Sequence, residues 1–207
     1  IITMSGLKRT CIKISLLGDT EVGKTKICGA FFKLDFVDEN ITSIGIENHE
    51  TKMKLENGEE IKVKIWDTAG QERFKNISIN TVKTSQGVLV VFDVTKRQSF
   101  NNVEVWLEKI KEKTNKVAIV LMGNKIDLPD VERVVTKKEA EEFAQKRKIP
   151  YFESSAKLRI NIDEAFSKVV NEAYNKYGNK DGMDITDKDN NGGGGCFGRK
   201  KNKKKKK

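Results

Sequence analysis

The sequence predicts an α/β domain in which a mostly parallel sheet is covered by helices on both faces. Apolar runs alternate along the chain with amphipathic segments, which is the pattern of successive strands and helices. Two of the runs, residues 87–92 and 117–122, are continuously apolar, as in strands buried on both faces. The 207 residues suffice for one such domain with a core of its own.

The elements can be placed in order along the chain. Strands are expected at residues 10–17, 47–56, 61–66, 87–92, 117–122 and 151–153. Helices are expected at residues 23–34, 99–113 and 137–148, and from Asn161 to about residue 177. Asn57-Gly58 predicts a hairpin turn, and Asn161 with Glu164 has the pattern of a capping box.

The composition changes after residue 177. Residues 178–198 are rich in Gly, Asn and Asp without an apolar period, which predicts a flexible linker. Residues 199–207, RKKNKKKKK, carry eight positive charges and no acidic residue, whereas the whole chain has a net charge of +10. The folded part is therefore almost neutral, and the basicity belongs to a tail.

The basic tail has two interpretations. It can attract anionic membrane, in which case acylation of Cys196 would add to binding; the alternative is a solvated tail with an unmodified cysteine. The second interpretation is nuclear import or nucleic-acid contact. No groove of interleaved aromatic and basic residues favours nucleic acid, so we expect no nucleic-acid partner.

The location expected from the sequence is cytoplasmic, with peripheral association with the cytosolic face of a membrane. No apolar stretch approaches the roughly 20 residues of a membrane span, and the first residues lack the pattern of a secretory signal. Cys11 and Cys28 lie in expected core elements and are predicted to be buried thiols, which fits a reducing compartment.

The first motif is GDTEVGKT, residues 18–25, which matches G-x-x-x-x-G-K-[ST] between an expected strand and an expected helix. The backbone N–H groups of such a loop form a nest for phosphate oxygens. Lys24 is expected to reach the terminal phosphates and assist catalysis, and Thr25 to ligate Mg²⁺. The alternative is an ordinary strand-to-helix turn. The nucleotide-binding residues expected here are Gly18, Glu21, Val22, Gly23, Lys24, Thr25 and Lys26.

The second motif is WDTAGQERF, residues 66–74, at the end of another expected strand. Asp67 is expected to hold Mg²⁺, through a water. Gly70 can bring its N–H close to a terminal phosphate because no side chain intervenes. Gln71 is expected to be catalytic, as a neutral side chain that orients the attacking water. Taken alone, this segment could equally be a turn at a strand end.

The third and fourth motifs, NKID at residues 124–127 and SSAK at residues 154–157, also follow expected strands. The Asp127 carboxylate can accept two N–H bonds from guanine, a donor pair that adenine lacks. The Ala156 N–H is expected to contact the guanine oxygen. The nucleotide-binding residues expected here are Asn124, Lys125, Asp127, Ser155, Ala156 and Lys157. NKID and SSAK are weak signals when taken alone, but all four motifs converge on one sheet edge, where such folds bind ligands.

The chain resembles the small GTPases of the Ras superfamily, and most of all the Rab family, over residues 8–177. The resemblance is carried by KIWDTAGQERF, VVFDVTKRQSFNNVEVWL, GNKIDL and SSAK. It implies a P-loop NTPase with a doubly wound, mixed six-stranded sheet of five parallel strands and one antiparallel edge strand. It also implies a GTP/GDP switch with Mg²⁺ and slow GTP hydrolysis, which regulates vesicle traffic.

Further residues and partners follow from the resemblance alone. Phe36 is expected to pack against guanine, the alternative being a core residue at a helix end, and Ser43 to bind nucleotide and Mg²⁺. The implied partners are an exchange factor, a GAP that supplies an arginine, and effectors, all acting on a monomer. Three other functions stay open: a GTP-binding module with negligible turnover, a switch outside membrane traffic, and an adenine-nucleotide enzyme.

The sequence departs from the family at positions that affect switching. Ser43 stands where a threonine is usual, and keeps the hydroxyl but loses a methyl group that restrains the rotamer. Glu21 stands where a small residue is usual, and its carboxylate would repel phosphate unless it points into solvent. Asn48 and the segment at residues 81–85 lack the family's aromatic residues, so its effectors cannot be transferred to this chain.

Overall fold

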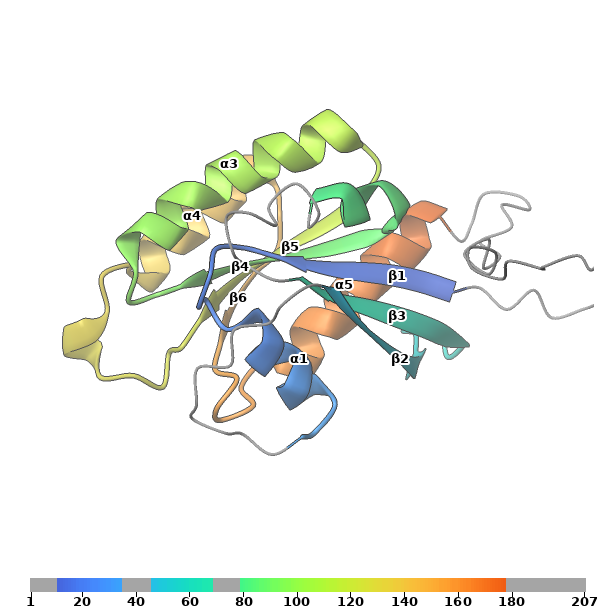
Figure 1. Ribbon diagram of the computed structural model, residues 1–207, viewed down its shortest axis with the longest axis horizontal. Helices are drawn as coiled ribbons and strands as arrows, with labels where there is room; N and C mark the ends of the chain where they lie inside the picture. The colour runs from blue at the N-terminus through green and yellow to red at the C-terminus, as the bar shows by residue number, and fades with distance from the viewer. Residues whose placement is uncertain (1–10, 35–45, 69–78, 178–207) are drawn as a thin grey trace, which may run out of the picture.

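The computed structural model describes residues 11–34, 46–68 and 79–177 of the chain. In this part, six strands form one sheet in the order β2-β3-β1-β4-β5-β6 (Figure 1). β2 pairs antiparallel with β3, and every other neighbouring pair is parallel, which confirms the mixed sheet expected from the resemblance. The strands are β1 (Cys11–Leu17), β2 (Ile46–Lys54), β3 (Glu60–Thr68), β4 (Gly87–Asp93), β5 (Ala118–Asn124) and β6 (Tyr151–Ser154).

Helices cover both faces of the sheet. They are α1 (Lys24–Phe31), α3 (Arg97–Lys113), α4 (Lys137–Arg147) and α5 (Ile162–Tyr177), with short 3₁₀ helices η2 (Val82–Thr84) and η3 (Asp130–Glu132). On one face, α1 and α5 contribute Ile27 and Phe166 to a core with Ile14 of β1. On the other face, α3 and α4 contribute residues such as Phe100 and Ala144 to a second core. Figure 1 shows these two layers on opposite sides of the strands.

The central strands are buried because both layers cover them. Every residue of β1 and of β4 is buried, as the continuous apolar run in β4 predicts. Cys11 and Cys28 are buried thiols, which confirms their expected place in the core. Among the residues that the structure describes, none of the helices combines the length and the apolar character needed to cross a membrane.

Helix boundaries depart from expectation by two residues or more at two points. α1 ends at Phe31 instead of residue 34, because Lys33 adopts a positive φ of 58°. α3 begins at Arg97, two residues before the expected start. Asn161 directly precedes α5 with a positive φ of 55°, and its side-chain amide donates to the Glu153 carbonyl at 2.6 Å; the capping box with Glu164 stays a prediction. A side-chain cap forms at α4, where Thr136 accepts the Glu139 N–H at 3.2 Å.

Candidate functional site

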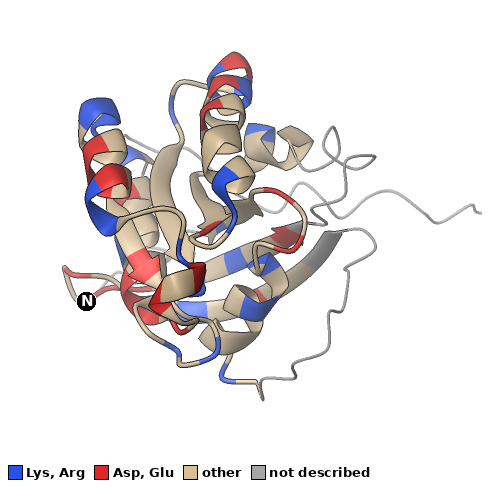
Figure 2. Ribbon diagram, turned by 90° about the vertical axis from the view of Figure 1, so that its left-hand side faces the viewer, with Lys and Arg blue, Asp and Glu red and all other residues tan. Residues whose placement is uncertain are grey.

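The four motifs meet at the sheet edge where the parallel strands end, which lies at the left of Figure 1. Residues 18–23 join β1 to α1, and Asp67 lies near the end of β3. Asn124 ends β5 and residues 125–127 follow it, while residues 155–157 follow β6. Figure 2 views this edge directly, with acidic and basic residues side by side on the loops and helix ends. Four predicted site residues lie outside the described part of the chain: Phe36, Ser43, Gly70 and Gln71.

The phosphate loop is curled so tightly that two of its positions require glycine. Gly18 has a φ of 144°, and a Cβ there would lie 2.2 Å from the Val91 carbonyl oxygen. Gly23 has a φ of 96°, and its Cβ would lie 2.4 Å from Nδ2 of Asn124. Glu21 also adopts a positive φ, of 62°. Left-handed residues turn successive N–H groups toward one point, as anion binding requires.

Lys24 is folded back over this loop. Its buried Nζ donates to the Gly18 carbonyl at 3.1 Å and to the Asp19 carbonyl at 2.7 Å. Burial lowers the pKa of the Lys24 ammonium to about 8, while the charges of Asp67 and Asp19 favour the charged form. The loop therefore holds a desolvated cation where phosphate charge is expected.

Asp67 and Thr25 supply the oxygen groups that Mg²⁺ prefers. Asp67 is 1% exposed on β3, and its negative charge acts on Lys24. Thr25 lies in the first turn of α1, directly after Lys24. A buried carboxylate beside a phosphate-binding loop fits a hard cation, so the residues present fit the metal that the sequence predicts.

Asn124 joins three of the motifs. Its side chain is buried, and Nδ2 donates to the Val22 carbonyl of the phosphate loop at 2.9 Å. Its Oδ1 accepts the Ala156 N–H at 3.2 Å. This N–H is thus engaged by Asn124, and the predicted contact between Ala156 and the guanine oxygen stays a prediction.

Asp127 and Lys125 are held by side chains from neighbouring segments. Ser155 Oγ donates to Oδ1 of the half-buried Asp127 at 2.6 Å, and itself accepts the Leu158 N–H at 3.0 Å. Lys125 has a φ of 72° and forms an ion pair with the fully buried Asp93, with 2.7 Å between Nζ and Oδ2. The hydrogen bond from Ser155 fixes the Asp127 carboxylate, which is predicted to recognise guanine.

The remaining predicted residues lie on the same loops and on α1. Val22 is buried, Lys26 is half-buried on α1, and Lys157 is exposed after β6. Glu21 points outward with its side chain 54% exposed, and Lys96 lies 2.9 Å from its Oε2. The hydrogen bond to Lys96 lowers the pKa of the Glu21 carboxyl, so this charge is partly compensated at the exposed surface of the loop.

Sequence reasoning missed two acidic residues of the site. Asp93 supports Lys125, and Asp19 receives hydrogen bonds from α3. Asp19 occupies a variable position of the first motif, where the motif requires no particular side chain. Its partners lie 83 and 87 residues further along the chain, beyond any local pattern.

Comparison with known proteins identifies the family. The Ras family model matches residues 13–175. The chain is 38% identical to the Ras-related protein Rab-13 of Rattus norvegicus over 169 residues, which cover 81% of this chain and 82% of that protein. It is 40% identical to Ras-related protein Rab-10 of Diplobatis ommata over 165 residues, covering 79% and 82% of the two chains. It is also 41% identical to the GTP-binding protein YPTM1 of Zea mays over 155 residues, covering 74% of each.

These matches show that the chain belongs to the Ras family and is a small GTPase most similar to the Rab proteins.

Proposed function

We propose that this protein is a GTP/GDP switch of membrane traffic with slow intrinsic GTP hydrolysis and a Mg²⁺ requirement. One observation carries the proposal: Asn124 connects the loop that holds Lys24 to the loops that hold Asp127 and Ser155. A group suited to phosphate and a group suited to guanine are thereby fixed to one buried side chain. A nucleotide that spans both loops is the ligand that this arrangement fits.

The chain's own residues divide the work. Lys24 and the loop N–H groups hold and neutralise the phosphates, and Gln71 orients the attacking water. Thr25, Ser43 and Asp67 would hold Mg²⁺, which supplies charge neutralisation when bound. Phe36 would pack against the base, and Gly70 would approach the terminal phosphate. Asp127 selects guanine, since adenine would leave this carboxylate without its donor pair.

Single-turnover hydrolysis tests whether the chain cleaves GTP or only binds it. At saturating Mg²⁺ and GTP, we expect one slow exponential release of phosphate that Gln71→Ala slows further without weakening GTP binding. Wild-type protein that holds GTP without releasing phosphate would instead be a binding-only module. Ser43→Ala should slow hydrolysis whereas Thr42→Ala should not, and the reverse result would contradict the role given to Ser43.

We also propose that the basic tail gives a monomeric protein peripheral, reversible attachment to anionic membrane on its cytosolic face. Each lysine near such a surface contributes about 1 kcal/mol, less with salt. Sedimentation with vesicles with and without anionic lipid, using the full chain and residues 1–198, tests this. Equal binding by the two proteins would contradict the role of residues 199–207. An exchange factor, a GAP and effectors complete the proposal as protein partners.

A further inference from the structure

The carboxylate of Asp19, in the phosphate loop, is held by α3. Asn102 Nδ2 donates to its Oδ2 at 2.6 Å, and Trp106 Nε1 donates to its Oδ1 at 3.0 Å. Asn102 and Trp106 are four residues apart and therefore lie on one face of the helix. Both oxygens of this acidic side chain are thus engaged by α3, and the charge of the carboxylate also acts on Lys24.

The backbone of the same residue holds Lys24. The Asp19 carbonyl accepts from Lys24 Nζ at 2.7 Å, a shorter hydrogen bond than the one at 3.1 Å from the same ammonium to the Gly18 carbonyl. Asp19 therefore contacts α3 through its side chain and the phosphate-binding lysine through its main chain. Both contacts are made by the same residue, so a shift of the Asp19 side chain with α3 is expected to shift the carbonyl that holds Lys24.

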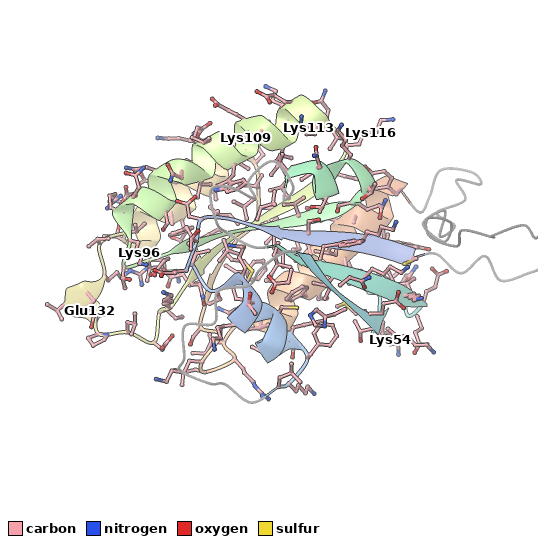
Figure 3. The ribbon with its side chains drawn as sticks, in the orientation of Figure 1. Lys54, Lys96, Lys109, Lys113, Lys116 and Glu132 are labelled. Carbon is pink, nitrogen blue, oxygen red and sulfur yellow. The ribbon has the colours of Figure 1, made fainter. Side chains whose placement is uncertain are left out.

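The end of α3 at the site is itself firmly placed. Trp106 is 3% exposed, and Phe100 packs against Phe92 of β4 with 4.9 Å between ring centroids. Arg97 near the helix start forms an ion pair with Glu139 of α4. Lys96 lies at this end of α3, as Figure 3 shows, whereas Lys113 lies at the far end. The phosphate loop is thus tied to a helix that is anchored to the sheet and to α4.

We propose that Asp19 is a positioning residue of the nucleotide site, which couples the placement of α3 to the placement of Lys24 and hence to phosphate affinity. The inference rests on the proposed function, because it takes guanine nucleotide as the ligand of the loop. It adds a connection from the phosphate loop to a surface helix: anything that shifts α3 alters the rate of nucleotide release.

The chemistry of the three side chains provides a reciprocal test. Asp19 must accept two hydrogen bonds, which asparagine cannot do, because its Nδ2 would face the donor of Asn102. Asn102→Asp instead places two carboxylates in contact. In the double variant Asp19→Asn/Asn102→Asp, Asn at 19 donates to Asp at 102 and still accepts from Trp106. Asn101→Asp is the matched control, since Asn101 is an exposed neighbour on α3.

Release of fluorescently labelled GDP in Mg²⁺ buffer measures the effect. Losing a charge-assisted bond should accelerate release about tenfold in Asp19→Asn and in Asn102→Asp. The double variant should return to within about threefold of wild type, and Asn101→Asp should match wild type. Unchanged release in both single variants, or a double variant slower to bind and faster to release than either, would overturn the inference.

A second measurement separates positioning from general destabilisation. In a Lys24→Ala background, Asp19→Asn should change GDP release by less than about twofold, since the positioned group is gone. An undiminished tenfold effect in that background would overturn the proposal. Urea unfolding of the single variants is the second check: a loss of unfolding free energy that accounts for the whole acceleration of GDP release would also overturn it. Wild-type protein that bound no labelled GDP would refute the proposed function instead, so the two failures are distinguishable.

Discussion

Replacing Asn124 by alanine should destabilise the domain as well as weaken nucleotide binding. The Asn124 side chain is 1% exposed and bonds both the Val22 carbonyl and the Ala156 N–H. Removing this side chain leaves both backbone groups without this partner. The site is tightly packed, since a Cβ added at Gly23 would lie 2.4 Å from Asn124 Nδ2. The variant thus separates loops that the native side chain holds together.

The magnitude follows from these two bonds. Each buried backbone group left unsatisfied costs about 1–3 kcal/mol, so the free energy of unfolding should fall by about 3 kcal/mol. For a domain of this size, that loss corresponds to a Tm lower by about 6–12 °C. An exposed asparagine gives the control: Asn115→Ala should stay within about 0.5 kcal/mol of wild type.

Urea unfolding of nucleotide-free protein, repeated with saturating GDP, is the assay. The loss should be larger with GDP, because the variant loses binding in addition to packing. A nucleotide-free Asn124→Ala protein within about 1 kcal/mol of wild type would refute the reasoning, since the two hydrogen bonds would then contribute little.

Three other predictions concern charges at the site. Burial holds the pKa of Lys24 near 8, so nucleotide-free protein loses this charge at higher pH and must take up a proton to bind phosphate. GDP affinity should therefore fall by up to about tenfold per pH unit above that value; a flat fluorescence titration from about pH 7 to pH 9.5 would contradict it. Asp127→Ala should weaken GDP at least about 100-fold with no change in ATP binding, because the guanine donor pair loses its acceptor; competition assays measure this, and retained GDP preference would count against the role of Asp127. Glu21→Gln should cost less than about 1 kcal/mol of unfolding free energy, because the ion pair with Lys96 is half-exposed; a loss above about 2 kcal/mol in urea would show a larger role for the pair.

Much of the fold follows from local sequence. The continuous apolar run of β4 and the alternation of strands with helices are local patterns, and both have their predicted place in the sheet. Element ends were harder to predict. α1 ends close to Lys33, which has a left-handed backbone conformation, and lysine is not a residue type that predicts a helix end. The Asn161 side chain donates to the carbonyl of Glu153, eight residues earlier, a contact that no helix-start pattern indicates.

The site divides in the same way. Glycines and a lysine at fixed spacing predict the phosphate loop, because its backbone geometry is local. The support of that loop is not local: Asp19 meets Trp106 of α3, and Lys125 meets Asp93 of β4. Such partners become visible only when the sheet brings distant segments together. The exposed placement of Glu21 beside Lys96 likewise explains how a carboxylate is accommodated in a phosphate-binding loop.

The nucleotide bound by purified protein tests the central claim most directly. Acid extraction followed by chromatography should give about one guanine nucleotide per chain, and unlabelled GDP, but not excess ATP, should displace labelled GDP from the site. Extraction of adenine nucleotide, or displacement of labelled GDP by ATP, would contradict a guanine-specific site built on Lys24, Asn124 and Asp127.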